Sequence, residues 1–173
     1  MKRLASVILA VILLMTTAAF AEKTYLGSLN VNGAFELKCT LPENYKMEIR
    51  EADTTQILAF IDSGDEAKPI MTLSIAFDEM YSSVERLNDL DEAALAQLET
   101  TFTAEEAATI TYGYTDHGTK LLMAQYGNEY IDFFTIYKGY DIEFLLSAGE
   151  EPLSDAQVKM VIDFLSDLEF VEA

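Results

Sequence analysis

Side chains that commonly perform nucleophilic or metal chemistry are scarce in this sequence. It contains one histidine, His117, and one cysteine, Cys39. A nucleophile, base and acid arrangement requires serine or cysteine together with histidine, and zinc requires several Cys or His ligands. His117 occupies the turn-forming sequence 116–118, which predicts a solvated turn residue. Cys39 alternates with Phe35 and Leu37, which predicts a buried thiol that acts as a small hydrophobic side chain. We therefore predict no catalytic residue, zinc site or internal disulfide.

Calcium needs only oxygen ligands, and one acidic segment offers them. Asp62, Asp65 and Glu66 cluster around Gly64 between two apolar runs. The segment lacks the regular spacing and terminal glutamate of an EF-hand loop. Because the chain has 30 acidic residues, neighbouring carboxylates also arise by chance. Asp62, Asp65 and Glu66 are the metal-ligand candidates for Ca²⁺, and a solvated acidic hairpin loop is the alternative.

Carboxylates could also act in pairs, as in glycoside hydrolases. Nothing in the sequence distinguishes one pair from the rest, and the chain has no Trp to form a sugar-binding platform. Its glycines do not form a phosphate-binding loop. A secreted hydrolase acting through carboxylates stays open as the alternative to a binding domain.

Aromatic residues concentrate in the segment 126–144, where Tyr126, Tyr130, Tyr137 and Tyr140 are the candidate binding residues. Alternation predicts that the strand 130–137 directs one set of side chains to each face of a sheet. The two sets are Tyr130, Asp132, Phe134 and Ile136, and Ile131, Phe133, Thr135 and Tyr137. A central strand covered on both faces explains this pattern. The functional alternative is that one end of the strand lines a groove for a peptide, a glycan or a small apolar ligand.

The N-terminus has the parts of a cleavable signal peptide. Lys2 and Arg3 precede an apolar stretch, and Ala19 and Ala21 fit the −3 and −1 positions of a cleavage site. We predict cleavage after residue 21, with an uncleaved membrane anchor as the alternative. Cys39 lies well beyond the cleavage site, so a lipoprotein is not predicted. The expected location is secreted or extracytoplasmic, in the cell envelope.

Cleavage makes an acidic chain more acidic. It reduces the basic residues from 11 to 9 against 30 acidic ones, a net charge of −21. Such a chain repels nucleic acid and anionic membrane surfaces, so neither is an expected partner and no stable membrane insertion is expected. Residues 22–173 suffice for one hydrophobic core, and we predict a single domain.

Apolar periodicity predicts the elements that position these residues. Period-two patterns predict strands at 25–31, 35–40, 45–50, 56–61, 70–77, 109–115, 120–126, 130–137 and 140–147. A helix with Asp89 as N-cap should present Leu95, Leu98 and Phe102, and a second helix should run from Asp155 to about Leu168. Short connections predict antiparallel neighbours. The fold class is therefore α+β, an antiparallel β-sheet flanked by helices.

The segments 35–45, 140–144 and 164–170 resemble the PsbP-like fold family. They correspond to its strand running into a proline turn and an aromatic residue, its last strand, and its final helix with a short exit strand. That family includes a photosystem II extrinsic protein, a small Ran-binding nuclear import factor and exported bacterial proteins without assigned roles. The resemblance implies an α/β/α sandwich and an accessory or binding role, and it transfers no functional residue.

These observations predict an exported, non-enzymatic binding domain. Its partner is an unidentified protein, glycan or small ligand that meets an acidic surface with a few exposed tyrosines. A self-associating envelope protein is the structural alternative to this interpretation and to the hydrolase.

Overall fold

The computed structural model describes residues 27–52, 55–65, 68–104, 106–148 and 151–173. The expected signal peptide therefore lies outside the described residues. The strands are β1 (Gly27–Val31), β2 (Phe35–Cys39), β3 (Lys46–Ala52), β4 (Gln56–Asp62), β5 (Ile70–Phe77), β6 (Thr109–Tyr114), β7 (Lys120–Tyr126), β8 (Tyr130–Tyr137), β9 (Tyr140–Ser147) and β10 (Glu169–Glu172). The helices are α2 (Glu92–Thr103) and α3 (Asp155–Ser166), with short 3-10 turns η1 (Glu79–Tyr81) and η2 (Leu87–Asp89). The α+β class predicted from the sequence is confirmed.

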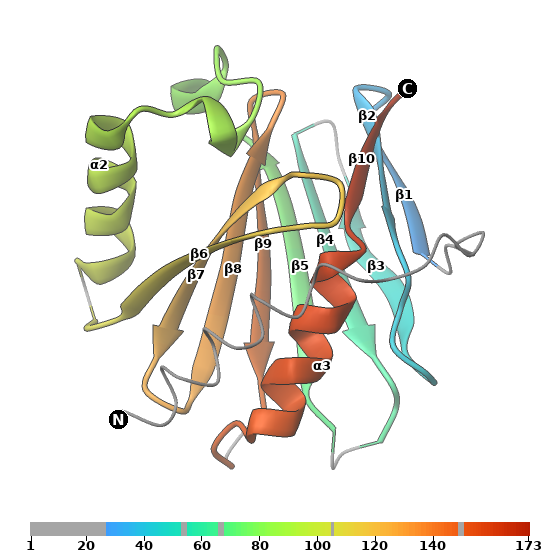
Figure 1. Ribbon diagram of the computed structural model, residues 1–173. Helices are drawn as coiled ribbons and strands as arrows, with labels where there is room; N and C mark the ends of the chain where they lie inside the picture. The colour runs from blue at the N-terminus through green and yellow to red at the C-terminus, as the bar shows by residue number, and fades with distance from the viewer. Residues whose placement is uncertain (1–26, 53–54, 66–67, 105, 149–150) are drawn as a thin grey trace.

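The larger sheet is built from two antiparallel meanders. Its strand order is β3-β4-β5-β9-β8-β7-β6, so β5 and β9 join one meander to the other (Figure 1). Each meander forms because its connections are short, while the longer connection from β5 to β6 contains α2. The predicted hairpins therefore exist, and the pairing of β5 with β9 is what makes them a single sheet.

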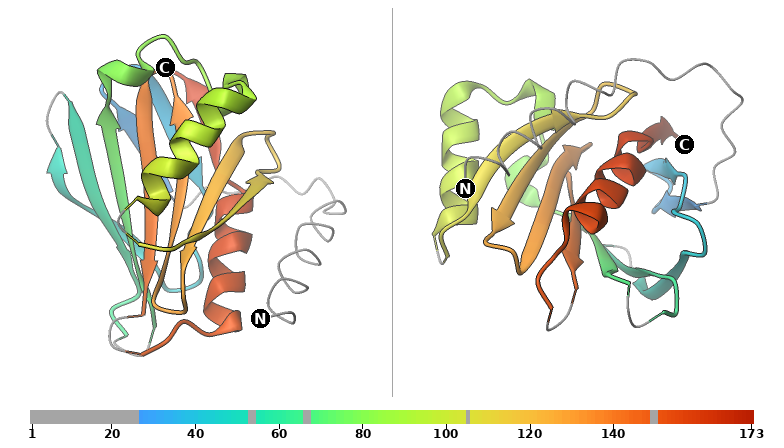
Figure 2. Two further views of the ribbon diagram at one scale, coloured as in Figure 1. Left: turned by 90° about the vertical axis from the view of Figure 1, so that its left-hand side faces the viewer. Right: turned by 60° about the horizontal axis from the view of Figure 1, so that its bottom comes forward.

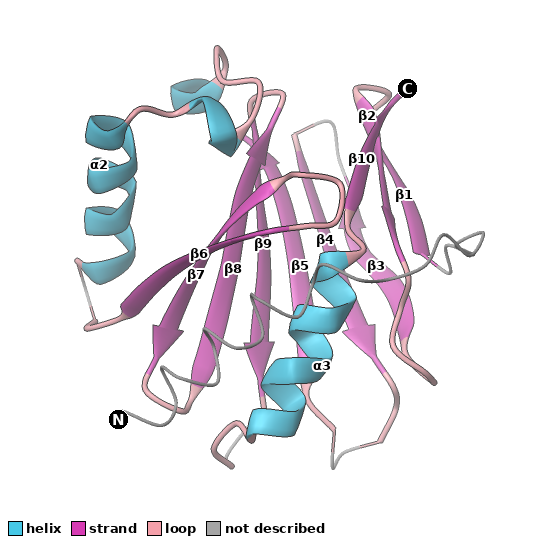
Figure 3. Cartoon of the chain, viewed as in Figure 1, coloured by secondary structure: helices cyan, strands magenta, loops and turns pink. Residues whose placement is uncertain are grey.

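A smaller sheet has the order β1-β2-β10, with β10 returning from the C-terminus to pair with β2. It packs with α3 on one face of the large sheet (Figure 3). Phe35 of β2 is fully buried and makes edge contacts with the rings of Tyr137, Tyr140 and Phe170 at centroid distances of 5.0, 5.5 and 5.7 Å. This aromatic cluster joins the small sheet to the large one.

Helix α3 follows the sequence prediction closely. Ser154 and Gln157 form a capping box at its start, and Val161, Phe164 and Leu165 are buried against the large sheet. The helix ends at Ser166, and the buried Leu168 follows in the turn toward β10. An apolar stripe of this width requires a covered sheet face, which the main core supplies.

Helix α2 begins later than the sequence predicted. Its N-cap is Asp91, whose carboxylate accepts a hydrogen bond from the amide of Ala94 at 2.8 Å. Asp89 instead accepts a hydrogen bond from the amide of Arg86 at 3.0 Å and closes η2. Aspartate is a favourable N-cap residue, so the sequence allows a helix to begin after either one. In the structure, the extended backbone of Leu90 separates η2 from the start of α2.

Asp91→Ala should lower the free energy of unfolding by about 1 kcal/mol, because it leaves an amide at the start of α2 without its acceptor. Asp91→Asn is the matched control and should lose less than half as much, since its side-chain oxygen can still accept that bond. Urea unfolding followed by circular dichroism measures both. Equal losses in the two variants would contradict the assignment of Asp91 as the cap.

Strand β3 is more exposed than the sequence predicted. Ile49 was expected on a buried face, yet its side chain is 50% exposed. β3 is the edge of the large sheet, and its register with β4 shifts between Ile49 and Glu51. Ile49 pairs with the buried Ala59, so it lies on the core face, but at the edge of the sheet the core covers it only in part, whereas Met47 packs against it.

Candidate functional site

The two faces of the large sheet are covered to different extents. One face carries the main core, under α3 and the small sheet. On the other face, α2 and its neighbouring turns cover β6, β7 and β8 through a second, smaller cluster. In the left view of Figure 2, α2 lies in front of the orange strands, and the green and cyan strands β3–β5 extend beyond it. No described element packs a buried cluster onto the β4, β5 and β9 part of this second face, which we call the open face.

Several apolar side chains remain accessible on the open face. Ile70 of β5 is 47% exposed and Leu145 of β9 is 38% exposed. Leu58 and Phe60 of β4 are half-buried beside them. The guanidinium of Arg50 lies 5.3 Å from the centre of the Phe60 ring and marks the outer boundary of the open face. Thr72 and Ser74 of β5 lie between the β4 and β9 side chains, and we call the four apolar side chains together the apolar strip.

Three carboxylates lie along the inner boundary of this strip. Glu143 and Asp141 are alternate residues of β9, so their side chains lie on the same face about 7 Å apart along the strand. Asp132 of β8 pairs with Leu145, which makes it the diagonal neighbour of Glu143. We call Asp132, Glu143 and Asp141 the carboxylate row.

The pKa of each carboxyl group in the row is raised above its ordinary value. Burial, followed by the nearby Glu143 carboxylate, raises the pKa of Asp132 to about 7. Burial and the charge of Asp141 raise the pKa of Glu143. Burial and the charge of Asp78 raise the pKa of Asp141, although backbone amides of Ala76 and Asp141 itself oppose that rise. The sheet therefore brings together negative charges that burial and mutual repulsion both destabilise.

The row also contains acceptors without donors. One side-chain oxygen of Asp132 and one of Asp141, both Oδ1, are buried and have no hydrogen-bond partner among the described residues. The ion pairs of the described residues, such as Arg50 with Glu48 at 3.0 Å, do not include the carboxylate row. A bound cationic group would supply the missing donors and positive charge.

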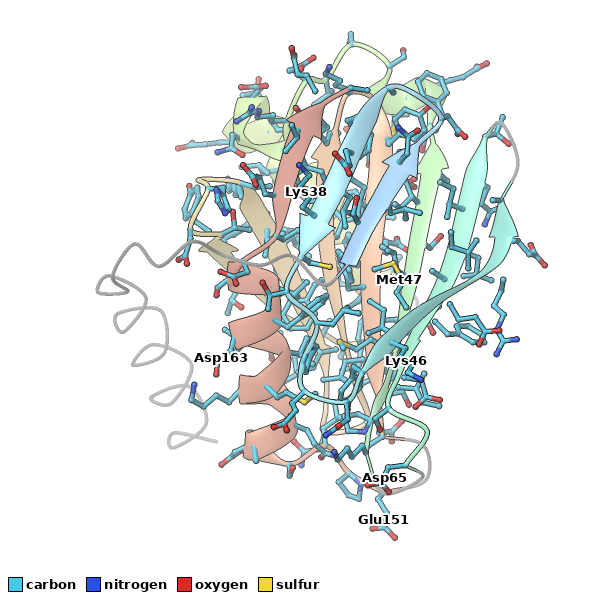
Figure 4. The ribbon with its side chains drawn as sticks, turned by 90° about the vertical axis from the view of Figure 1, so that its right-hand side faces the viewer. Lys38, Lys46, Met47, Asp65, Glu151 and Asp163 are labelled. Atoms are coloured by element: carbon cyan, nitrogen blue, oxygen red, sulfur yellow. The ribbon has the colours of Figure 1, made fainter. Side chains whose placement is uncertain are left out.

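The sequence-predicted calcium candidates lie at one end of the open face. Asp62 and Asp65 line a cavity of about 420 Å³ together with Lys68, Ile70 and other residues. Figure 4 shows Asp65 at the lower end of the molecule, in the loop between β4 and β5. The Asp62 carboxylate accepts a hydrogen bond from the Gly64 amide at 2.9 Å and so closes this loop. Glu66 lies outside the described residues.

The described carboxylates do not converge as metal ligands do. Over the described ranges, no group of three or more His, Cys, Asp or Glu side chains is placed to hold a metal ion. The calcium hypothesis stays a prediction. It is tested by the melting temperature in millimolar calcium, where a rise that disappears in the Asp62→Asn and Asp65→Asn double variant would support it and an unchanged value would end it.

The four candidate tyrosines do not share one surface. The rings of Tyr126 and Tyr130 stack at 4.4 Å on the α2 side, whereas Tyr137 and Tyr140 lie in the aromatic cluster on the opposite face. The hydroxyl of Tyr126 donates to the carbonyl of Phe102 at 2.8 Å, and that of Tyr130 donates to Glu106 at 2.8 Å. These contacts fasten the end of α2 to the sheet.

The contacts of His117 and Cys39 are those of residues that hold the fold together. The Nδ1 atom of His117 lies 3.8 Å from a carboxylate oxygen of Glu169, which brings the β6–β7 turn against the start of β10. Cys39 is fully buried, as predicted, and burial raises the pKa of its thiol to about 12. A thiol with so high a pKa is a poor nucleophile.

The carboxylate row could not be identified from the sequence as a site. The alternation of Asp141 and Glu143 with Ile142 and Phe144 predicts one polar face for β9, which the structure has. What brings Asp132 to the same place is the pairing of β8 with β9, and the row is half-buried where the cluster under α2 ends. An acidic residue within the apolar strand 130–137 was the one available signal.

Comparisons with known proteins do not assign a function. No protein-family model matches the chain, and no curated protein matches it. In the described residues, no helix has the length and apolar character needed to cross a membrane.

Proposed function

We propose that this chain is an exported, non-enzymatic binding domain and that the open face is its binding surface. One observation carries the proposal: half of one sheet face presents accessible apolar side chains beside three desolvated carboxylates. Desolvating carboxylates without a counter-charge opposes folding, so their presence on this surface suggests a role in binding. The N-terminal sequence supports export, and the resemblance to the PsbP-like family supports an accessory role.

The binding surface is tested by comparing what wild-type and variant domains capture. The domain from residue 22 onward is immobilised and exposed to extracts of its host and the medium around it. Ile70→Arg with Leu145→Arg should abolish retention of the specific partner, because two charges would replace the most exposed side chains of the apolar strip. Both side chains are exposed, so the double variant should stay folded.

A matched variant separates loss of the site from loss of surface apolarity in general. Thr109 and Tyr114 are exposed on β6, the edge strand at the opposite end of the large sheet from β3. Thr109→Arg with Tyr114→Arg adds the same two charges there and should retain the partner at the wild-type level. Equal loss from both double variants, or retention by both, would overturn the assignment of the open face.

Glycoside or peptide hydrolysis is the second candidate, favoured by Asp132 and Glu143. A carboxyl group with a pKa of about 7 beside a second carboxylate is the arrangement used for general acid and base catalysis. Turnover of a polysaccharide or peptide substrate by the purified domain, abolished by Glu143→Gln, would replace the binding proposal. The accessible apolar strip favours binding, because such a surface excludes water only when a partner covers it.

A further inference from the structure

We infer that the open face docks an amphipathic helix from a partner protein, whose apolar stripe covers Ile70 and Leu145 and whose lysine or arginine side chains reach the carboxylate row. This inference rests on the proposed function and names the chemistry of the partner.

The width of the open face suits one helix. Neighbouring strands lie about 4.8 Å apart, so β4, β5 and β9 present three columns of side chains across about 10 Å. An α-helix with its side chains is about 10–12 Å in diameter. α2 already covers the β6–β8 part of the same face, and a second helix beside it would complete that layer.

The chemistry of the open face requires both apolar and cationic groups. Ile70, Leu145 and the half-buried Phe60 need apolar contacts to exclude water. Directly beside them, the half-buried Asp132, Glu143 and Asp141 concentrate negative charge that no ion pair of the described residues neutralises. On an amphipathic helix, lysine or arginine at the border of the apolar stripe supplies both at neighbouring positions, because residues three and four apart lie on one face.

Other occupants fit less well. A second copy of this chain would bring another acidic row against the first, with 30 acidic residues on each copy. An extended peptide pairs with the edge of a sheet, whereas the backbone groups of β4, β5 and β9 already pair with their neighbours on both sides. A polyamine would neutralise the row and leave the apolar strip exposed.

The test uses a synthetic probe helix. A fluorescent peptide of about 18 residues, with a leucine stripe bordered by lysines, spans about 27 Å. Its affinity for the domain from residue 22 onward is measured by fluorescence anisotropy. Two comparison peptides carry glutamate in place of lysine, or the same composition in an order without a stripe. The lysine helix should bind at least tenfold more tightly than either one.

Variants of the domain locate the binding site. Glu143→Gln with Asp141→Asn should weaken binding of the lysine helix about tenfold, because it removes two charges from the row. Glu151→Gln with Asp155→Asn removes the same charge from exposed positions at the start of α3 and should change the affinity less than twofold. Leu145→Ser keeps all three carboxylates, adds no cation beside Asp132 and should weaken binding about fivefold, which provides the test if the first variant fails to fold.

Three results would overturn the inference. They are equal binding of the unpatterned peptide, unchanged affinity in both open-face variants, and complete competition by spermine at concentrations similar to that of the peptide. If the Ile70 and Leu145 double variant still loses its captured partner, the open face remains the binding surface and only the helical, cationic nature of the partner is refuted. If capture is retained as well, both proposals fail.

Discussion

Asp132→Asn should raise the melting temperature by about 4–8 °C at about pH 8 and leave it nearly unchanged at about pH 4. Burial, with help from Glu143, raises the pKa of Asp132 from 3.8 in the unfolded chain to about 7 in the folded one. The full linkage free energy of such a shift is about 4 kcal/mol, and partial exposure of the side chain reduces our expectation to about 2 kcal/mol. Thermal unfolding followed by circular dichroism across this pH range measures the effect.

The sign follows from proton binding. A carboxyl group with a raised folded-state pKa binds its proton more tightly in the folded chain, so it stabilises the fold below the unfolded pKa of 3.8. That contribution is lost as the pH rises through about 7. Asparagine carries no charge at either pH and therefore removes the loss. Glu143 and Asp141 also have raised pKa values, so part of the pH dependence should persist.

Glu129→Gln is the matched control, because Glu129 is exposed in the turn between β7 and β8. It should change the melting temperature by less than about 1 °C at either pH. A lower melting temperature for Asp132→Asn at high pH would mean that the Asp132 carboxylate is stabilised in the folded chain, contrary to the electrostatics of the row.

Phe35→Ala should cost about 3–5 kcal/mol of unfolding free energy, the largest loss expected from a single substitution considered for this protein. Phe35 is fully buried and contacts Tyr137 and Tyr140 of the large sheet and Phe170 of β10. Its removal leaves a cavity where the two sheets meet. Urea unfolding measures the loss, and hydrogen exchange should show the amides of β1, β2 and β10 losing protection before those of β8.

Tyr114→Ala is the aromatic control for this substitution, because Tyr114 is 56% exposed on β6. It should cost less than about 1 kcal/mol. A similar cost for the two variants would mean that the aromatic cluster does not hold the small sheet in place.

If the proposed function is correct, the carboxylate row lowers the stability of the domain and strengthens its binding to a cationic partner. Asp132→Asn should stabilise the domain, whereas the loss of negative charge from the row should weaken a cationic partner. Residues that reduce stability are often retained because they act in function. A stabilised domain that binds the probe helix less tightly would therefore support both proposals together.

Local patterns predicted most elements of the fold because each depends on neighbouring residues. The helical periodicity after Asp155, the alternation of Phe35, Leu37 and Cys39 and the alternation in β8 are all short-range signals. The wrong cap for α2 shows the limit of such signals, because Asp89 and Asp91 both fit the cap pattern. Only the extended backbone of Leu90 separates their roles.

The candidate site was beyond prediction for a different reason. Its residues come from β4, β5, β8 and β9, which are brought together by strand pairing. Tyr126 and Tyr140 were equal candidates in the sequence, yet the pleat directs them to opposite faces, one toward α2 and one toward the small sheet. The row itself consists of acidic residues that look like ordinary solvent-facing positions in an acidic chain.

The sequence by itself determined the α+β composition, the antiparallel hairpins, the buried thiol of Cys39 and the apolar face of α3, since periodicity, turn chemistry and capping act within a few residues. The tertiary structure alone decided that β5 pairs with β9, that β10 builds a second sheet, and that α2 covers only part of one face. Those outcomes depend on which apolar surfaces pack together and exclude water, and these surfaces lie far apart along the chain. The same choice leaves the apolar strip accessible beside three carboxylates that form no ion pair with the part of the chain that the structure describes.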